Sequence, residues 1–280
     1  MENNLRKTLH EHGFSLKKKY GQNFLSDQEL LEEIVDLSGI DENTTVLEIG
    51  CGAGALTKVL AKKAKKVVGY EIDTTLKPVL EDSLFGLTNV EIIFNDIMKC
   101  KMSDVELKLP NDYVMVANLP YYITTPIVTN FLENSKKIKS MSIMVQEEVA
   151  NRFSASAGES DYGAITVAIA LRGSAKIIKH VGREKFTPVP NVDSAVVKID
   201  IDKTKNAGVN FVDVRDVVRC AFSSRRKMLI NNIMNHYKIK REDAERVLLK
   251  ANVSLTARGE QLNESQFVQL TGIIKEIINV

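Results

Sequence analysis

Four residues that can bind a ligand each follow an apolar segment of the chain. Gly50 opens the turn in "VLEIGCGAGAL", Glu71 ends "KVVGYE", Asp96 follows "EIIFN" and Asn118 ends "YVMVAN". If the four segments are strands of one open α/β sheet, their carboxyl ends meet at a single crevice, where such sheets bind ligands. We therefore predict that these four positions line one site.

The glycine turn and the two acids indicate what this site binds. The run from Gly50 to Ala55 satisfies both G-x-G-x-G and the dinucleotide pattern G-x-G-x-x-G/A, so a nicotinamide cofactor stays open. Glu71 lies 21 residues after Gly50, where a carboxylate can accept hydrogen bonds from ribose hydroxyls. Asp96 could accept one from an adenine amino group. Glycine, glutamate and aspartate at these positions predict an adenosine-containing ligand.

Asn118 begins the unusual stretch "NLPYY". Its amide oxygen accepts hydrogen bonds, and Pro120 fixes the chain so that the carbonyl of Leu119 can face the same side. Two acceptors holding an exocyclic amine would localise the nitrogen lone pair and make it a nucleophile towards an activated methyl group. Tyr121 would stack on the base, a contact worth about 1–3 kcal/mol. The alternative is an ordinary turn with core aromatics.

Alternating strands and helices must position these residues. Strands next to helices of about ten residues indicate parallel βαβ units, and after the polar hinge at 202–208 the pattern is helical throughout. We therefore expect a sheet domain at 1–203, with a basic N-terminal extension, and a small helical domain at 209–280. Strands are predicted at 44–50, 66–73, 89–96, 112–120, 139–146 and 194–201. Helices are predicted at 26–40, 54–64, 76–85, 126–133, 147–153, 162–171, 211–222, 227–234, 241–251 and 263–279.

Composition excludes several classes of protein. The 280 residues are 44% hydrophobic, enough for a real core, and the three cysteines form no C-x-x-C pair. A disulfide framework and a thiolate zinc site are therefore not expected, and the four histidines match no metal or catalytic spacing. The N-terminus has no apolar leader, and the longest apolar run, 164–171, is too short to span a bilayer. We expect no membrane association, a cytoplasmic location and a monomer.

Basic charge lies at the two ends of the chain. Residues 1–20 contain five basic and two acidic residues, and residues 205–280 contain 13 and 8, although the whole chain carries only +2. Solvated helix faces would explain such runs, but clustering at two ends favours a nucleic-acid partner equally well. The candidate RNA-binding residues are Lys17, Lys18, Lys19, Arg225, Arg226 and Lys227.

Taken together, six stretches in order resemble the ribosomal RNA adenine N6-dimethyltransferase family. They are "GQNFL", "EIGCGAG", "GYEID", "NLPY", "FTPVPNVDSAVV" and "AFSSRRKML", and the resemblance extends over nearly the whole chain. The resemblance implies a Rossmann-like class I methyltransferase sheet domain with a C-terminal helical domain, and S-adenosyl-L-methionine as cofactor. The sequence is most similar to the branch that dimethylates two adjacent adenosines in the 3′-terminal hairpin loop of small-subunit rRNA during ribosome biogenesis.

The resemblance also assigns roles to residues. In the family, the matching positions bind the cofactor, hold the target base, or stack on it. Phe186 matches a second aromatic that sandwiches the base opposite Tyr121. Three alternatives remain: a large-subunit rRNA methyltransferase of the macrolide-resistance type, a nicotinamide-dependent oxidoreductase, and a non-catalytic RNA-binding factor. The implied cofactor residues are Asn23, Leu25, Gly50, Gly52, Glu71, Asp96 and Asn118, and the implied catalytic residues are Asn118, Leu119, Pro120, Tyr121 and Phe186.

The substrate implied is rRNA in an assembling small subunit. A stacked adenine cannot reach Asn118, so the target base must be turned out of its strand, which costs least in a hairpin loop. Because the sulfonium of the cofactor is already a strong electrophile, the protein mainly has to align the reacting atoms and exclude water. A strongly basic side chain is not required.

Overall fold

The computed structural model describes residues 23–25, 27–109 and 111–278. The chain divides into two compact units. The first contains the residues up to Ala150 together with Ala175–Ile201, and the second contains Asn151–Ser174 together with the chain from Asp202 onward. The first unit is built on a β-sheet, and the second is helical.

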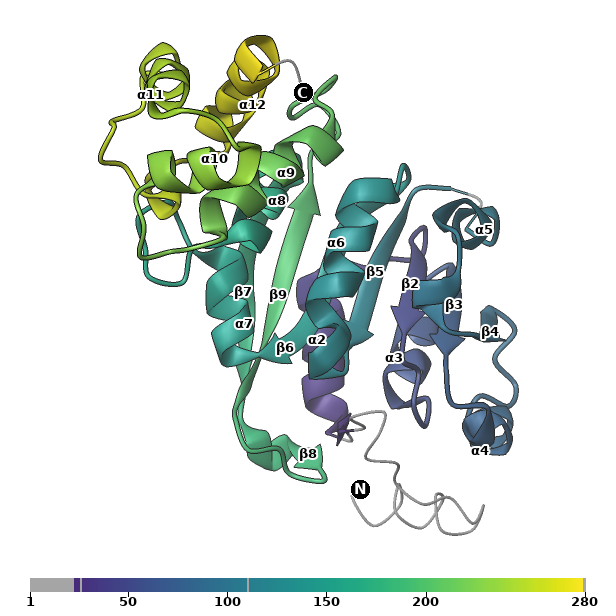
Figure 1. Cartoon of the computed structure of the whole chain (residues 1–280). Coiled ribbons are helices and arrows are strands. Elements are labelled where there is room, and N and C mark those ends of the chain that lie inside the picture. The colour runs from purple at the N-terminus through teal and green to yellow at the C-terminus, as the bar shows by residue number, and fades with distance from the viewer. Residues whose placement is uncertain (1–22, 26, 110, 279–280) are drawn as a thin grey trace. The chain divides into compact units, whose positions relative to one another are not determined.

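A seven-stranded sheet forms the centre of the first unit (Figure 1). Its strand order is β4-β3-β2-β5-β6-β9-β7. Neighbours from β4 to β6 are parallel, whereas β9 runs antiparallel to β6. The parallel part was predicted from the alternation of strands and helices. The strands are β2 (Thr45–Ile49), β3 (Lys66–Glu71), β4 (Val90–Phe94), β5 (Tyr113–Asn118), β6 (Ile138–Gln146), β7 (Gly173–Val181) and β9 (Ser194–Ile201).

The central strand β2 is buried along its whole length. A parallel strand is covered by helices on both faces of the sheet, so it needs apolar residues at nearly every position. The charged residue Glu48 is an exception; it is paired with Gly69 of β3 and is only 1% exposed. A Cβ at Gly69 would lie 2.4 Å from the sulfur of Cys51, so the absence of a side chain there makes room for the turn after β2.

Helices cover both faces of this sheet. Figure 1 shows α6 crossing in front of the strands and α2 behind them. α2 buries Leu31, Ile34 and Val35 on one face, and the carboxylate of Asp27 caps its first turn by accepting a hydrogen bond from the N–H of Leu30. The helix is shorter at both ends than predicted. The helices are α2 (Gln28–Ser38), α3 (Ala55–Lys63), α4 (Lys77–Ser83), α5 (Met102–Leu107), α6 (Thr124–Asn134) and α7 (Glu147–Ser154), the last of which continues into the second unit.

The second unit has a hydrophobic core of its own. Val217, Ile233, Leu248 and Phe267 come from four different helices and are at most 2% exposed. The hydroxyl of Tyr162 donates a hydrogen bond of 2.9 Å to the carbonyl of Leu262. All four C-terminal helices overlap the predicted segments, although the helix predicted at 227–234 runs over Leu229–Tyr237. The helices are α8 (Ala164–Arg172), α9 (Phe211–Phe222), α10 (Leu229–Tyr237), α11 (Arg241–Lys250) and α12 (Glu264–Ile278).

Three elements of the structure were not predicted as strands. β7 lies at one edge of the sheet, and two-residue strands β1 (Phe24–Leu25) and β8 (Phe186–Thr187) pair antiparallel with each other. The β1–β8 pair brings Phe24 and Leu25 beside Thr187 and Phe186. Among the described residues, no helix has both the length and the apolar character needed to cross a bilayer.

Candidate active site

Three glycines form the turn between β2 and α3. Their φ angles are 79° at Gly50, 56° at Gly52 and 82° at Gly54, a region that side chains strongly disfavour. A Cβ at Gly52 would also lie 3.0 Å from the ring of Phe24. Gly54 directly precedes the first residue of α3. The turn therefore requires glycine both for its backbone conformation and for the close approach of β1.

Glu71, at the end of β3, holds this turn in place. One carboxylate oxygen accepts a hydrogen bond of 2.9 Å from the N–H of Gly52, and the other accepts one of 2.9 Å from the N–H of Asp73. Burial raises the pKa of Glu71, and these two N–H groups oppose that rise. Each carboxylate oxygen can accept a further hydrogen bond. Glu71 can therefore support the turn and still bind hydroxyl groups of a ligand.

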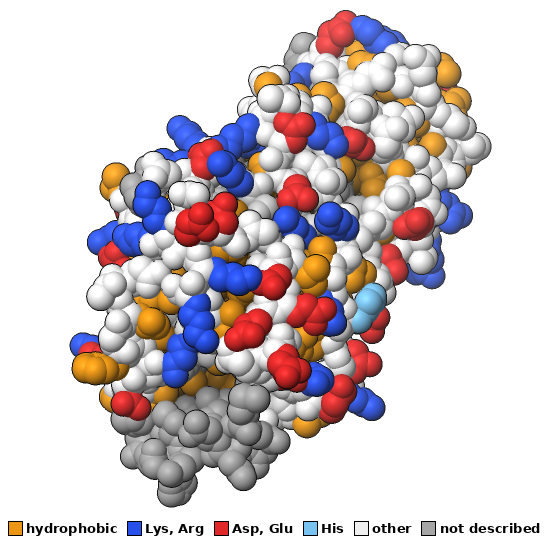
Figure 2. Space-filling view, turned by 180° about the vertical axis from the view of Figure 1, so that it is seen from behind, with side chains coloured by type: hydrophobic (Ala, Val, Ile, Leu, Met, Phe, Trp, Pro, Cys, Tyr) orange, Lys and Arg blue, Asp and Glu red, His pale blue; other side chains and the backbone are white. Residues whose placement is uncertain are grey.

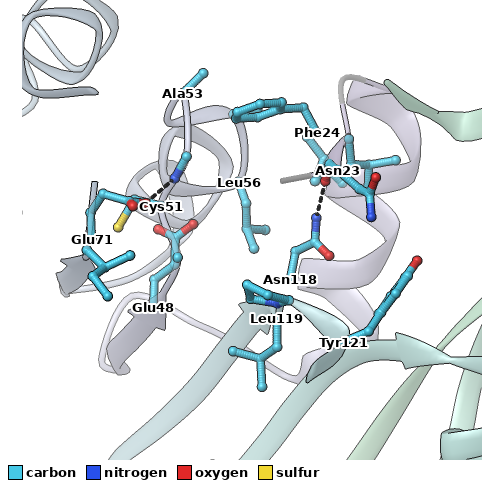
Figure 3. Close-up of a pocket in the computed structure, with 17 residues that line it drawn as sticks. Asn23, Phe24, Glu48, Cys51, Ala53, Leu56, Glu71, Asn118, Leu119 and Tyr121 are labelled. Atoms are coloured by element: carbon cyan, nitrogen blue, oxygen red, sulfur yellow. Dashed lines mark hydrogen bonds between the residues drawn. The ribbon is translucent and has the colours of Figure 1, made fainter. Parts of the chain in front are cut away.

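The side-chain amide of Asn118, at the end of β5, has a defined orientation. Its nitrogen donates a hydrogen bond of 3.1 Å to the backbone carbonyl of Asn23. Because a carbonyl only accepts, the amide nitrogen must face Asn23, and the amide oxygen is left for another donor. In Figure 3 this oxygen points towards the side of the cavity where Tyr121 lies. Asn118 therefore presents an acceptor to the side of the cavity where Tyr121 lies.

The ring of Tyr121 is held by its hydroxyl group. The hydroxyl lies 2.9 Å from the hydroxyl of Ser194, which is completely buried at the start of β9. Burial raises the pKa of the Tyr121 phenol, and the Ser194 contact opposes this rise. The phenol is therefore neutral at physiological pH. With its outer end fixed, the ring has a set orientation at the edge of the cavity (Figure 3).

These residues line one cavity at the carboxyl ends of β2, β3 and β5. Its empty volume, including the part open to solvent, is about 810 Å³. The predicted residues in its wall are Asn23, Leu25, Gly50, Gly52, Glu71, Asn118, Leu119, Pro120 and Tyr121. The wall also contains residues that were not predicted, namely Phe24, Leu31, Glu48, Cys51, Ala53, Ala55, Leu56 and Ile72.

Two predicted site residues lie outside this wall. Asp96 comes after β4, where its carboxylate accepts a hydrogen bond from the N–H of Met98 in its own turn. Phe186, in β8, is 2% exposed and packs in the core with Leu25 and Leu31. The roles assigned to Asp96 and Phe186 therefore stay predictions. For Phe186 to stack on a base, its ring would have to leave the core.

The candidate RNA-binding residues differ in their surroundings. Lys17, Lys18 and Lys19 lie outside the described residues. The guanidinium of Arg225 donates a hydrogen bond of 2.6 Å to the carbonyl of Ser160 and lies 3.7 Å from the carboxylate of Glu260. Within the described part of the chain, Arg226 and Lys227 are exposed and have no ion-pair partner. The face seen in Figure 2 mixes acidic and basic side chains, so net charge alone does not mark a binding surface.

The fold and the cavity define a class of protein. The class I methyltransferase fold is a mostly parallel seven-stranded sheet with one antiparallel strand, here β9 between β6 and β7, and a glycine turn after the central strand. The site adds the acidic residue Glu71 at the end of β3 and the asparagine Asn118 at the end of β5. We therefore place the chain in this class.

Comparison with known proteins gives the family. The family model described as ribosomal RNA adenine dimethylase matches residues 13–270. The chain is 41% identical to ribosomal RNA small subunit methyltransferase A of Geobacillus thermodenitrificans, over 98% of this chain and 96% of that protein. It is 42% identical to the protein of the same name from Anoxybacillus flavithermus, over 95% and 92%. The chain belongs to the ribosomal RNA adenine dimethylase family.

Two solved structures agree with this assignment. A dimethyladenosine transferase from Plasmodium falciparum is similar with a TM-score of 0.78 and 27% identity, over 91% of this chain and 98% of that one. The 23S rRNA methyltransferase ErmE is similar with a TM-score of 0.68 and 27% identity, over 90% and 100%. The predicted fold and family are confirmed.

Proposed function

We propose that this protein transfers methyl groups from S-adenosyl-L-methionine to the N6 atoms of two adjacent adenosines in the 3′-terminal hairpin loop of small-subunit rRNA. The observation that carries the proposal is the fixed amide of Asn118, whose oxygen faces the side of the cavity where Tyr121 lies. Family membership and the names of the similar curated proteins support the same reaction. A cytoplasmic enzyme acting on an assembling ribosomal subunit fits this proposal.

The residues of the cavity suit the proposed cofactor. The glycine turn leaves space that a Cβ at Gly52 would fill, and Glu71 retains lone pairs for ribose hydroxyls. Glu48 places a buried carboxyl group in the wall, which suits a ligand that carries positive charge. When bound, the cofactor would supply an electrophilic methyl group on its sulfonium.

The chain itself would bind and orient the amine. The amide oxygen of Asn118 and the carbonyl of Leu119 would accept the two N–H bonds of the adenine N6, which favours a tetrahedral nitrogen with a localised lone pair. Tyr121 would stack on the base and keep it in line with the methyl group. After methylation the amine becomes acidic and loses its proton to water. After the first transfer one N–H is left, so in a second transfer one of the two acceptors would hold this N–H while the nitrogen lone pair faces a new methyl donor.

Two substitutions of Tyr121 separate the contribution of its ring from that of its hydroxyl group. Tyr121→Phe keeps the ring and removes only the bond to Ser194, so we expect the Michaelis constant for RNA to change by less than about threefold. Tyr121→Ala removes the ring, and the loss of one stacking contact of about 1–3 kcal/mol should raise that constant about 5- to 150-fold. Steady-state assays on small subunits would measure both. Equal effects of the two variants would contradict the stacking role.

The three basic residues before α10, Arg225, Arg226 and Lys227, give a second prediction. Charge reversal at Arg226 and Lys227 should weaken RNA binding and reduce its dependence on salt, because each side chain is free to contact a phosphate. Arg225→Glu should instead lower the free energy of unfolding by about 0.5–1 kcal/mol, since Arg225 is engaged with Ser160 and Glu260. Binding measured between 50 and 200 mM salt, with thermal unfolding, distinguishes these effects. An unchanged salt slope in the Arg226 and Lys227 variant would contradict the RNA role.

The large-subunit reaction is the second candidate. The structure of the Plasmodium dimethyladenosine transferase is more similar than that of ErmE, and the curated relatives carry a small-subunit name. To test the proposal, the purified protein is incubated with radiolabelled methyl donor and unmethylated small or large subunits, and the RNA is digested to nucleosides. We expect labelled N6,N6-dimethyladenosine from small subunits. Label in large subunits alone would favour the second candidate, and no label in either would favour a non-catalytic RNA-binding role.

A further inference from the structure

Glu48 is an unusual residue for the middle of a buried strand. Among the described acidic residues, it is the only one with a side-chain oxygen that is buried and has no hydrogen-bond partner. A buried polar group without a partner is costly, and a buried charge costs more. The residue nevertheless lies in the wall of the cavity (Figure 3). Its carboxyl group is therefore a candidate for a role towards the ligand.

The surroundings of Glu48 favour its neutral form. The titratable groups that face it are Glu71, from β3, and Cys51, from the glycine turn, and neither can offset a negative charge. From α3 it is faced by Thr57, whose hydroxyl makes no hydrogen bond of good geometry but lies close enough to the carboxyl to favour its ionised form, and from α2 the wall contributes Leu31. Within the described chain no basic group lowers its pKa. Burial is the largest influence and raises the pKa of Glu48 to about 8; the hydroxyl of Thr57 opposes this rise, and the neighbouring Glu71 adds to it.

The proposed cofactor brings positive charge into this wall. The methyl donor carries a sulfonium and an α-ammonium group, both on its amino-acid half. A cation next to a buried carboxyl favours the ionised form, because the two charges attract strongly where water is excluded. The orphan oxygen of Glu48 would then gain a charged neighbour in place of a missing hydrogen bond.

We infer that Glu48 binds the positive charge of the cofactor and that this binding is coupled to its deprotonation. The carboxyl group is neutral in the free protein and gives up its proton when the cationic half of the cofactor occupies the cavity. This inference rests on the proposed use of S-adenosyl-L-methionine. It makes Glu48 a residue that selects for a charged ligand. The proton goes to solvent, so the charge of the cation is balanced by the carboxylate that it creates.

Linkage gives the expected dependence on pH. Because the ionised form must be produced for binding, donor affinity should rise about tenfold for each pH unit between about pH 5 and about pH 7, below the range near pH 8 in which the α-ammonium of the donor itself titrates. In parallel, binding at pH 7 should release most of one proton. Calorimetry of donor binding in two buffers with different ionisation enthalpies measures this release directly, without any turnover.

Three ligands identify the charge that matters. Methylthioadenosine has neither cationic group and should release no proton. The demethylated product, S-adenosylhomocysteine, has the α-ammonium but no sulfonium. Release with the product equal to that with the donor assigns the effect to the ammonium, and release with the donor alone assigns it to the sulfonium. Equal release by methylthioadenosine would overturn the inference, because the adenosine half, beside Glu71, would then be its cause.

Glu48→Gln is the decisive variant. It keeps the shape of the side chain but cannot ionise, so proton release and the pH slope of donor affinity should both disappear, while methylthioadenosine binds as before. The variant should also fold. The raised pKa of Glu48 gives a contribution to stability that is full below pH 4.5 and is lost as the pH rises through about 8. Glutamine avoids this loss, so the variant should unfold at a higher temperature than the parent at pH 8, with little difference at pH 5.

Glu106→Gln is the matched control. Glu106 is also buried, but one carboxylate oxygen accepts hydrogen bonds from the hydroxyl of Ser135 and the N–H groups of Lys136 and Lys137, and it does not line the cavity. Its variant should release protons as the parent does. Unchanged release by Glu48→Gln would overturn the inference. Donor binding by the parent without proton release would overturn it but leave the proposed function intact, whereas a parent that binds no donor would contradict the proposed function.

Discussion

Asn118→Ala should lower the rate of methyl transfer at saturating substrate by at least about a hundredfold, the size of effect seen when one preorganised hydrogen-bonding group is removed from an active site. The variant loses the acceptor that would hold the adenine amine. It also loses the bond between its amide nitrogen and the carbonyl of Asn23, so donor binding should weaken but persist. Single-turnover assays and calorimetry measure the two effects separately.

Asn118→Asp is the control for this prediction. It keeps an oxygen acceptor of the same shape, but one carboxylate oxygen would then face the carbonyl of Asn23, and two acceptors repel each other. We expect this variant to bind the donor more weakly than Asn118→Ala. Turnover of Asn118→Ala within a few-fold of the parent would show that the amide does not act on the amine.

Phe186→Ala should lower the free energy of unfolding by about 3–5 kcal/mol, as expected when a fully buried phenylalanine is cut back to alanine. The ring packs with Leu25 and Leu31, so its removal leaves a cavity beneath β1. Denaturant unfolding would measure the change. Phe85→Ala is the control, since that ring is 90% exposed and should contribute little.

Phe186→Leu separates packing from a role towards the base. Leucine fills most of the volume, so the loss of stability should be about 1–1.5 kcal/mol. If the ring also sandwiches the target base, RNA affinity should fall well beyond what this small loss explains. Normal affinity of a stably folded Phe186→Leu protein would show that Phe186 is a core residue only.

Much of the sheet could be predicted because its strands carry a strong local signal. The central strands are buried on both faces, so each appears as a short, nearly continuous apolar run. β7 has no such signal: most of its residues are partly or fully exposed, as befits an edge strand, and "GSAKIIKHV" contains two lysines and a histidine. β1 and β8 have two residues each and exist only because segments about 160 residues apart meet. No local pattern encodes that pairing.

The site residues also divide into those with a signal in the local sequence and those that depend on long-range contacts. Gly50, Glu71 and Asn118 were predicted because the ends of parallel strands must meet at one edge of the sheet. Glu48 carried a signal that was not used, namely a charged residue inside an apolar run. The engagement of Arg225 could not be predicted, because its partner Ser160 is 65 residues away in the chain. Sequence identifies which residues are at strand ends, but tertiary contacts decide which basic residues remain free.

The short β1–β8 pair physically connects the wall of the proposed cofactor site with a residue that is proposed to contact the target base. Leu25, in the wall of the cavity, pairs with Phe186. The amide nitrogen of Asn118 donates a hydrogen bond to the carbonyl of Asn23, the residue just before β1. Any displacement of Phe186 towards an incoming nucleotide must therefore pull on the strand that borders the donor. The amide protons of Leu25 and Phe186 should consequently exchange with deuterium at a common rate, so that the enzyme cannot loosen its hold on one ligand while leaving the other undisturbed.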